Sequence, residues 1–444
     1  MTDRSGGVPL IRPLIAAALV ASAAALAEGP QTLTIDEAVN EALRVNDQLK
    51  AVRYRAEGAE DTARSARGRL LPVLNASDTW QHWDGPFVIS LGPPGTPSSG
   101  LVARNINTNV FTVAAQQPIL GLLHRERDLK AASASADASR ADELDAQSQI
   151  AEQVRTTYLR HFGSRAGVAI AEASIEQLQK QVQDAQARYN AGTITKADLL
   201  RFQTAVANAQ QLRIQQATLA QTARQALLTL LARNPEDPTV EFVEPVDLEK
   251  QAAVRPPESV DELINRALKN RPEVARAQKE AEAARANGQA RMWALLPEVD
   301  VQAAYSNVRG QVFQPENASF IGVVSSWPFF TWGTRWYAAQ SAQRQADASA
   351  SLLENTRKQV AFDVSSKAVQ LDAQFVAVQV AETAIASAEE AYRVTTAQVS
   401  AGTATTTDLL DAQSALTTAR ANLARAQYDR AIARVALDRA TTAR

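Results

Sequence analysis

The chain carries the same set of short motifs twice, in the same order. The matched pairs, each given by its first residue, are TIDEA and SVDEL at 34 and 259, LLP at 70 and 295, and AGT followed by DLL at 191 and 401. Pro297 follows Pro72 by 225 residues, whereas Pro328 follows Pro118 by 210. Repetition at a fixed spacing indicates a duplicated structural unit. Any fold for this chain must therefore be built from two copies of one unit.

The two copies differ by fifteen residues, and the whole difference lies between the paired prolines. The extra residues of the first copy fall in the stretch GPPGTPSSG at 92–100. Such a composition is typical of a loop. The repeats are assigned to residues 28–233 and 259–444, and the stretch 234–258, which opens with NPEDP, is assigned as a linker.

Each copy predicts a helix, two strands, a very long helix, a turn and a return helix. Residues 35–71 have helical periodicity and end at a proline. Strands are predicted at about 73–83 and 104–117 in the first copy, and at about 298–308 and 319–327 in the second. The prolines assigned to the strand–helix junctions are Pro72, Pro118, Pro297 and Pro328. An additional proline, Pro272, is expected to kink or restart the first helix of copy two.

The longest helix is predicted between Gly121 and Asn190, a stretch without proline. About 70 residues at a rise of about 1.5 Å each would reach roughly 100 Å. A helix of that length needs similar helices packed along it. Glycine in the following AGT turn suits the left-handed position that ends a helix. The return helix is expected to run to about Arg233.

The strand pairs have the alternation of a membrane β-barrel. Val299, Val301, Ala303 and Tyr305 alternate with mostly polar residues, which predicts an apolar face towards lipid and a polar face inside. All six tryptophans lie in or beside the strand pairs. They indicate either an interfacial aromatic belt or the packing of a small sheet. Asp78 falls on the apolar side and breaks the pattern.

Two hairpins cannot close a barrel by themselves, because four strands leave open edges in lipid. The sequence therefore predicts an oligomer.

Residues 1–27 are interpreted as a signal peptide. Arg4 and Arg12 precede an apolar run from Leu14 to Ala24, and Ala25-Leu26-Ala27 supplies a small-residue cleavage site. A membrane anchor is the alternative, but the apolar run is short for about 30 Å of hydrocarbon.

Composition and motifs exclude several functional classes. The formal net charge of −2 gives no basic footprint for nucleic acid. The absence of cysteine excludes disulfides, thiolate metal sites and a lipid-modified N-terminal cysteine. Phosphate-binding, dinucleotide-binding and zinc-protease motifs are missing, and His82, His124 and His161 are scattered. No metal, cofactor or enzymatic activity is expected.

The twofold repeat, the LLP endings and the AGT turns followed by DLL resemble the TolC-type outer-membrane efflux proteins. This resemblance implies a mainly α fold with a membrane β-barrel portion: a homotrimer with a 12-stranded β-barrel and a long α-helical barrel in the periplasm. It implies a passive exit duct of a tripartite efflux or type I secretion system, partnered by outer-membrane lipid, a periplasmic membrane-fusion adaptor and an inner-membrane transporter. The alternative is a periplasmic coiled-coil adaptor or scaffold, although adaptors usually have one helical hairpin and scaffolds lack the strands.

The resemblance assigns the pore constriction to Asp408 and Asp411, which lie three residues apart on one helix face. A ring of six carboxylates in a trimer would raise some pKa values and attract cations. The pattern Thr405-x-x-Asp408 equally indicates a capping box, whereas Asp411 corresponds to Arg201 in copy one.

The same resemblance assigns adaptor contact to the helical tips at Gly192, Thr193, Gly402 and Thr403. Two positions differ from those of some relatives. Ala404 stands where these relatives carry a basic residue that latches the closed entrance, and Val399 stands where they carry a tyrosine. How this entrance is latched is therefore an open question.

Overall fold

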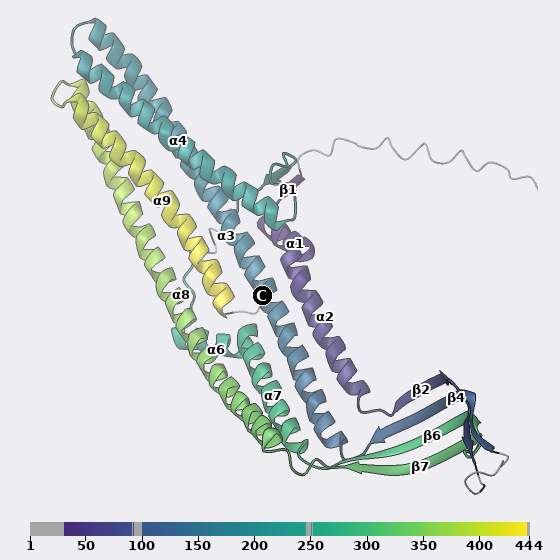
Figure 1. Cartoon of the computed structure of the whole chain (residues 1–444). Coiled ribbons are helices and arrows are strands. Elements are labelled where there is room, and N and C mark those ends of the chain that lie inside the picture. The colour runs from purple at the N-terminus through teal and green to yellow at the C-terminus, as the bar shows by residue number, and fades with distance from the viewer. Residues whose placement is uncertain (1–30, 91, 93–99, 246–249, 251, 442–444) are drawn as a thin grey trace, which may run out of the picture.

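The computed structural model describes residues 31–90, 92, 100–245, 250 and 252–441. The signal peptide assigned to 1–27 and most of the insertion at 92–100 lie outside these residues. The described chain is mainly helical, as predicted, and it is elongated, with the strands at one end and two helical tips at the other (Figure 1).

Both copies follow the same order of elements. The first copy comprises α1 Ile35–Val45, α2 Asp47–Gly68, β2 Val73–His82, β3 Phe87–Ile89, β4 Leu101–Pro118, α3 Leu122–Asn190 and α4 Lys196–Leu230. The second comprises α6 Val260–Asn270, α7 Pro272–Trp293, β6 Glu298–Gln311, β7 Asn317–Ser326, α8 Thr334–Ser400 and α9 Thr406–Thr441. At about 1.5 Å per residue, the 69 residues of α3 span the predicted length of about 100 Å.

The first helical stretch is interrupted in both copies. In copy two the break falls at Arg271, because a residue before proline avoids the helical conformation. In copy one a break at Asn46 was not predicted. The Asn46 side chain accepts hydrogen bonds from the backbone N–H groups of Gln48 (3.0 Å) and Leu49 (3.2 Å). Asn46 therefore ends α1 and caps α2.

The stretch assigned as a linker contributes to a small parallel sheet. Within it, β5 (Val240–Phe242) pairs with β1 (Gln31–Leu33). The buried Tyr158 hydroxyl of α3 lies 2.8 Å from the carbonyl oxygen of Leu33 and 2.5 Å from that of Val243. Burial raises the pKa of Tyr158 to about 12. The hydroxyl thus ties both short strands to the longest helix of the first copy.

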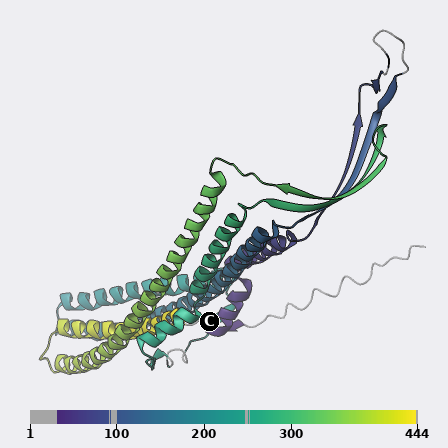
Figure 2. The same cartoon turned by 90° about the horizontal axis from the view of Figure 1, so that it is seen from below.

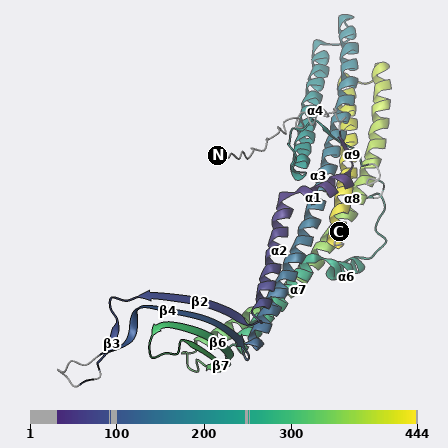
Figure 3. The same ribbon diagram turned by 90° about the vertical axis from the view of Figure 1, so that its right-hand side faces the viewer.

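The main sheet has the strand order β2-β4-β6-β7, and β3 pairs with β4. All of these pairings are antiparallel (Figures 1 and 3). Residues 87–89 pair with the beginning of β4, so β4 starts at Leu101 instead of the predicted 104 and the first copy has an additional short strand. The central pair β4–β6 joins the two copies into one sheet.

The helical part has its main core where α1, α3, α4 and α9 meet the small sheet. Val154, Tyr158, Leu159 and Leu227 are completely buried there. No helix among the described residues has both the length and the apolar character needed to cross a membrane.

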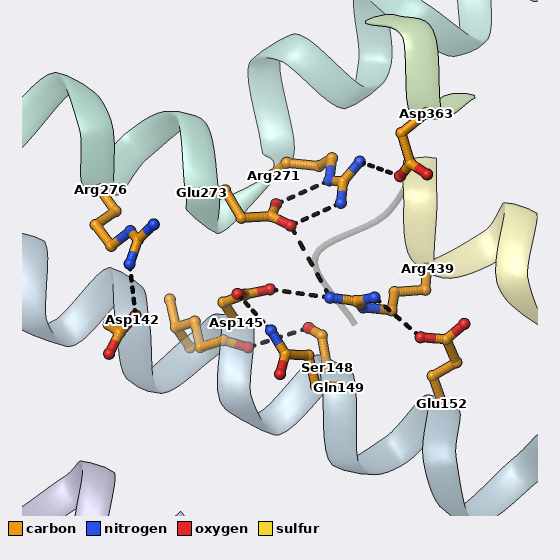
Figure 4. A network of polar contacts seen from close by, with 11 residues as sticks. Asp142, Asp145, Ser148, Gln149, Glu152, Arg271, Glu273, Arg276, Asp363 and Arg439 are labelled. Atoms are coloured by element: carbon orange, nitrogen blue, oxygen red, sulfur yellow. Dashed lines mark hydrogen bonds and ion pairs between the residues drawn. The ribbon is translucent and has the colours of Figure 1, made fainter. Parts of the chain in front are cut away.

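A network of charged side chains joins the two copies near the α6–α7 break (Figure 4). Arg439 of α9 lies 3.3 Å from Asp145 of α3 and 3.9 Å from Glu273 of α7. Arg271 donates to Glu273 and to Asp363 of α8. Burial, with the negative charge of Glu273, raises the pKa of Asp145. The network therefore links α3 of the first copy to three helices of the second.

Candidate channel entrance and membrane segment

Each long helix ends in the same glycine-dependent turn. Gly192 has φ +74°, and its N–H donates to the carbonyl of Tyr189 (2.9 Å) while that of Thr193 donates to Arg188 (3.0 Å). This is the Schellman arrangement. The second copy repeats it at Gly402, also at φ +74°, and at Thr403. The four tip residues assigned to adaptor contact therefore share one backbone geometry, and their glycines are exposed.

The return helices begin with matching capping boxes. The Thr195 hydroxyl donates to Asp198 (2.7 Å), and the Thr405 hydroxyl donates to Asp408 (2.7 Å). The backbone N–H groups of Asp198 and Asp408 donate back to the threonine hydroxyls. Hydrogen bonds from the Thr405 side chain and backbone lower the pKa of Asp408. Within one chain Asp408 is therefore an exposed, ionised carboxylate with a capping role.

Asp411 lies one turn further along α9. Asp408 and Asp411 are both exposed, whereas Leu409, Gln413 and Leu416 of the same helix are buried. The two acids therefore share the face of α9 that is turned away from its packed neighbours.

The two hairpins also touch each other near their tips, which sequence reasoning missed. Arg201 of α4 donates to the Thr407 hydroxyl (2.7 Å), and the Thr406 hydroxyl donates to Asp198 (2.9 Å). Arg201 also lies 3.6 Å from Asp198. In the sequence, only Arg201 indicated this contact between the hairpins, because copy two has an acid, Asp411, at the corresponding position.

Apolar side chains reinforce this contact between the hairpins. Ala185, Leu199, Phe202 and Leu409 form a buried cluster, with Val399 packed against it. Val399 therefore supports the tip cluster through packing alone.

The register of the main sheet separates two faces. Apolar residues gather on one face, comprising Leu74, Ala76, Phe111, Val113, Ala115, Val301, Ala303, Tyr305, Ile321 and Val323. The opposite face carries most of the polar residues, Asn75, Ser77, Thr79, Thr112, Gln116, Asp300, Gln302 and Ser306, together with the apolar residues Val73, Val110, Phe320 and Val324. This is the alternation of a sheet with lipid on one side and water on the other.

The position of Asp78 follows from the same register. Asp78 lies on the apolar face and accepts a hydrogen bond from Asn109 (2.7 Å). Asp78 pairs with Phe111, Phe111 pairs with Asn307, and Asn307 pairs with Asn317. Three of the four residues in this row are therefore polar, although the row lies on the apolar face. Asp78 therefore marks the edge at which the apolar band turns polar.

The exposure of the six tryptophans bears on whether they form an interfacial aromatic belt or pack a small sheet. Five of the six are exposed: Trp80, Trp293, Trp327, Trp332 and Trp336. Trp83 alone is partly buried; its ring lies 3.6 Å from the Arg104 guanidinium, and its Nε1 donates to Thr108. Packing of a small sheet therefore accounts best for Trp83, whereas the other five tryptophans are exposed in the single chain.

The four junction prolines flank the long strands. Pro72 and Pro297 directly precede β2 and β6, Pro118 is the last residue of β4, and Pro328 follows β7 by two residues. Among the described residues, no three His, Cys, Asp or Glu side chains are grouped as a metal site.

Comparisons with known proteins agree on one family. The sequence profile of the outer membrane efflux proteins matches residues 38–233 and 263–443. The outer membrane efflux protein BepC of Brucella suis is 23% identical over 438 residues, covering 97% of this chain and 90% of its own. The outer membrane protein TolC of Vibrio cholerae is 23% identical over 402 residues, covering 88% and 87%.

Solved structures show the same fold. The outer membrane protein VceC of Vibrio cholerae has a TM-score of 0.77 at 19% identity, covering 92% of this chain and 95% of its own. CusC has a TM-score of 0.80 at 16% identity, covering 92% of both chains.

The family match spans both repeats and therefore most of the chain. Members of the family are passive outer-membrane channels with a long periplasmic helical portion, and they are not enzymes. They are trimeric and interact with adaptors and inner-membrane pumps. This chain belongs to the outer membrane efflux protein family.

Proposed function

We propose that three copies of the chain form one continuous exit duct through the outer membrane and into the periplasm. The observation that carries this proposal is the open sheet. Among the described residues, β2 and β7 each have a strand partner on one side only, although the sheet has a largely apolar band on one face. Unpaired strand edges are not tolerated in lipid. Joining β2 of one copy to β7 of the next gives a closed barrel of twelve strands, four from each copy.

The helical part supports the same assembly. The helix α8 carries a stripe of exposed apolar residues, comprising Phe362, Val369, Val376 and Val380. On α4, Leu200, Ile214 and Leu219 are also exposed. Apolar stripes on outer helices are typical of surfaces that pack against another helix. Neighbouring copies would cover them and complete a helical barrel.

The duct would serve a tripartite efflux or type I secretion system. Its exposed tips at Gly192-Thr193 and Gly402-Thr403 would contact a periplasmic adaptor, and an inner-membrane transporter would drive transport. Membership of the family removes the alternative of a periplasmic adaptor or scaffold.

Asp408 and Asp411 would line the narrowest part of the duct. Their shared exposed face on α9 supports this role. Three copies would bring six carboxylates around the axis, where they attract cations and oppose one another. The contacts of Arg201 with Thr407 and of Thr406 with Asp198 would hold the two hairpins of each copy together beside this ring.

Conductance of the reconstituted channel tests the constriction. We expect Asp411→Asn, and more strongly Asp408→Asn with Asp411→Asn, to weaken block by divalent cations and to raise conductance. The matched control is Asp198→Asn, because Asp198 has the same capping box but an arginine three residues later.

If Asp198→Asn changes conductance as much as the double variant does, loss of a cap explains the effect and the constriction is refuted. If Asp411→Asn leaves conductance and block unchanged, the ring does not limit the pore.

A further inference from the structure

A groove of about 720 Å³ lies near the middle of the long helix α3. Helices α4 and α9 both pack against α3 and form the two walls of the groove. Figures 1 and 2 show α4 and α9 running from this region towards the two helical tips. The groove therefore lies outside the proposed constriction and outside the main sheet.

The two glycines of α3, Gly163 and Gly167, line this groove, which we name the glycine groove. A Cβ atom on Gly163 would lie 3.3 Å from the ring of Tyr428, and one on Gly167 would lie 2.7 Å from Oε1 of Gln216. The glycines therefore let Tyr428 and Gln216 lie directly against the backbone of α3, which leaves the space beside them open. Copy two has alanine at both corresponding positions, 373 and 377, so the repeated fold does not require glycine there.

The glycine groove opens on the face of α3 that is opposite to the small sheet. Tyr158 points towards that sheet, because its hydroxyl donates to the carbonyls of Leu33 and Val243. Gly167 follows Tyr158 by nine residues, which is about two and a half helical turns and places it on the opposite side of the helix. Arg160 precedes Gly167 by seven residues, about two turns, and shares its face.

On α9 the groove lies on the same side as the proposed constriction. Asp411, Thr418 and Arg425 follow one another at intervals of seven residues, about two helical turns, and all three are exposed. Asn422 lines the glycine groove and also a second groove, of about 780 Å³ between α8 and α9, which includes Asp411. With Asp411 facing the lumen of the duct, the glycine groove opens into the same lumen. It lies about 21 Å along α9 from Asp411, at about 1.5 Å per residue.

The walls of the groove combine apolar side chains with an excess of positive charge. The charged residues are Arg160, Arg425 and Asp429. Arg425 lies 3.4 Å from Asp429, whereas Arg160 forms no ion pair within the described part of the chain. Three partly buried apolar side chains complete the walls: Ile170, Leu212 and Ile432. The groove therefore places one uncompensated cation beside an apolar surface.

We propose that the glycine groove binds exported molecules that combine an apolar body with a carboxylate. Arg160 would hold the carboxylate, because a guanidinium presents paired N–H donors that match its two oxygens. The apolar body would lie against the walls formed by α4 and α9, where it is removed from water. The volume of about 720 Å³ is within the range of about 300–1,000 Å³ that is typical of small-molecule sites.

This inference deepens the proposed function and rests on the groove facing the lumen of the duct. The groove is open along one side, so a bound molecule would keep contact with water and bind weakly. Weak binding suits a duct, because passage requires that a molecule both enters a site and leaves it.

Block of single-channel conductance by naphthoate tests the proposal on the full-length protein in planar bilayers. We expect naphthoate to reduce the conductance in a saturable way, and the uncharged naphthamide, which has the same rings, to block more weakly. Arg160→Gln introduces the residue type that copy two has at the corresponding position, Gln370. We expect this variant to weaken the block by naphthoate about tenfold, because a hydrogen bond between charged groups is lost. Equal block by naphthoate and naphthamide would overturn the proposal.

Arg165→Gln is the matched control on the same helix. Arg165 is exposed and follows Tyr158 by seven residues, so it lies on the face turned towards the small sheet. Its guanidinium lies 5.5 Å from the ring of the buried Phe162. We expect Arg165→Gln to leave the block by naphthoate unchanged. If Arg165→Gln and Arg160→Gln weaken the block equally, the effect belongs to the net charge of the chain and the groove is refuted.

A second variant covers the case in which Arg160→Gln does not assemble. Thr222 is exposed on α4 and lines the groove, so Thr222→Trp places an indole in the space proposed for the apolar body without changing the charge. We expect this variant to weaken the block by naphthoate. A block as strong as in the wild-type protein would show that naphthoate binds elsewhere.

The wild-type protein separates this proposal from that of the duct. Channels that conduct but are not blocked by naphthoate, as when a neighbouring copy covers the groove, overturn the binding site and leave the duct intact. Absence of channels from the wild-type protein would refute the duct itself.

Discussion

Replacing Arg271 with methionine should destabilise the packing of α7 against α8 within the second repeat. The Arg271 side chain is 7% exposed and forms hydrogen bonds of 2.6 and 2.8 Å to Glu273 and of 2.8 Å to Asp363. Methionine keeps an unbranched apolar stem but leaves both carboxylates without this partner. Removing one member of a buried ion pair costs about 3–5 kcal/mol. Glu273 and Asp363 retain some solvent contact, so we expect the lower end, about 3 kcal/mol.

A matched exposed pair provides the control. Arg213 of α4 lies 2.8 Å from Glu172 of α3, and both side chains are about half exposed. An exposed ion pair contributes about 0–1 kcal/mol, so Arg213→Met should have little effect. Urea unfolding in detergent, followed by the helical circular dichroism signal, measures both variants. Equal destabilisation of the two proteins would refute the conclusion that the buried Arg271 ion pairs stabilise the second repeat.

Four further changes test other parts of the structure. Tyr158→Phe should lower the free energy of unfolding by about 1–2 kcal/mol in urea titrations, because the hydrogen bonding of the buried hydroxyl to the carbonyls of Leu33 and Val243 is lost. Gly192→Ala and Gly402→Ala should each cost about 1–2 kcal/mol in the same assay, because both residues have φ +74°. Burial lowers the pKa of His161 from 6.5; the unfolded chain therefore binds the proton first, and stability should fall as the pH drops through 6.5. His161→Phe should make the urea midpoint depend less on pH in this range. Deleting residues 86–100 removes β3 but none of the four long strands, so trimers should still form on size-exclusion chromatography; loss of assembly would contradict the alignment of the repeats.

Much of the fold could be predicted because its signals are local. The repeat, the proline-free stretch of α3 and the AGT turns are read directly from neighbouring residues, and the Thr405–Asp408 capping box has a fixed spacing. Strand alternation in β6 likewise predicted the apolar face that the register shows.

The missed features depend on partners far apart in the sequence. The parallel pair β1–β5 joins residues more than 200 positions apart, and the contact of Arg201 with Thr407 links two hairpins. The break at Asn46 was missed for a different reason, because an asparagine within a predicted helix indicates a helix end less strongly than a proline such as Pro272 does. The account of Asp78 likewise required the register with Asn109, which the sequence did not specify.

Electron microscopy of the detergent-extracted mature protein tests the central claim most directly. A duct built from three copies predicts threefold particles with a barrel at one end and a helical stalk of about 100 Å, the length of α3 at about 1.5 Å per residue. Particles of a single chain, or filaments that form without detergent, would contradict the duct.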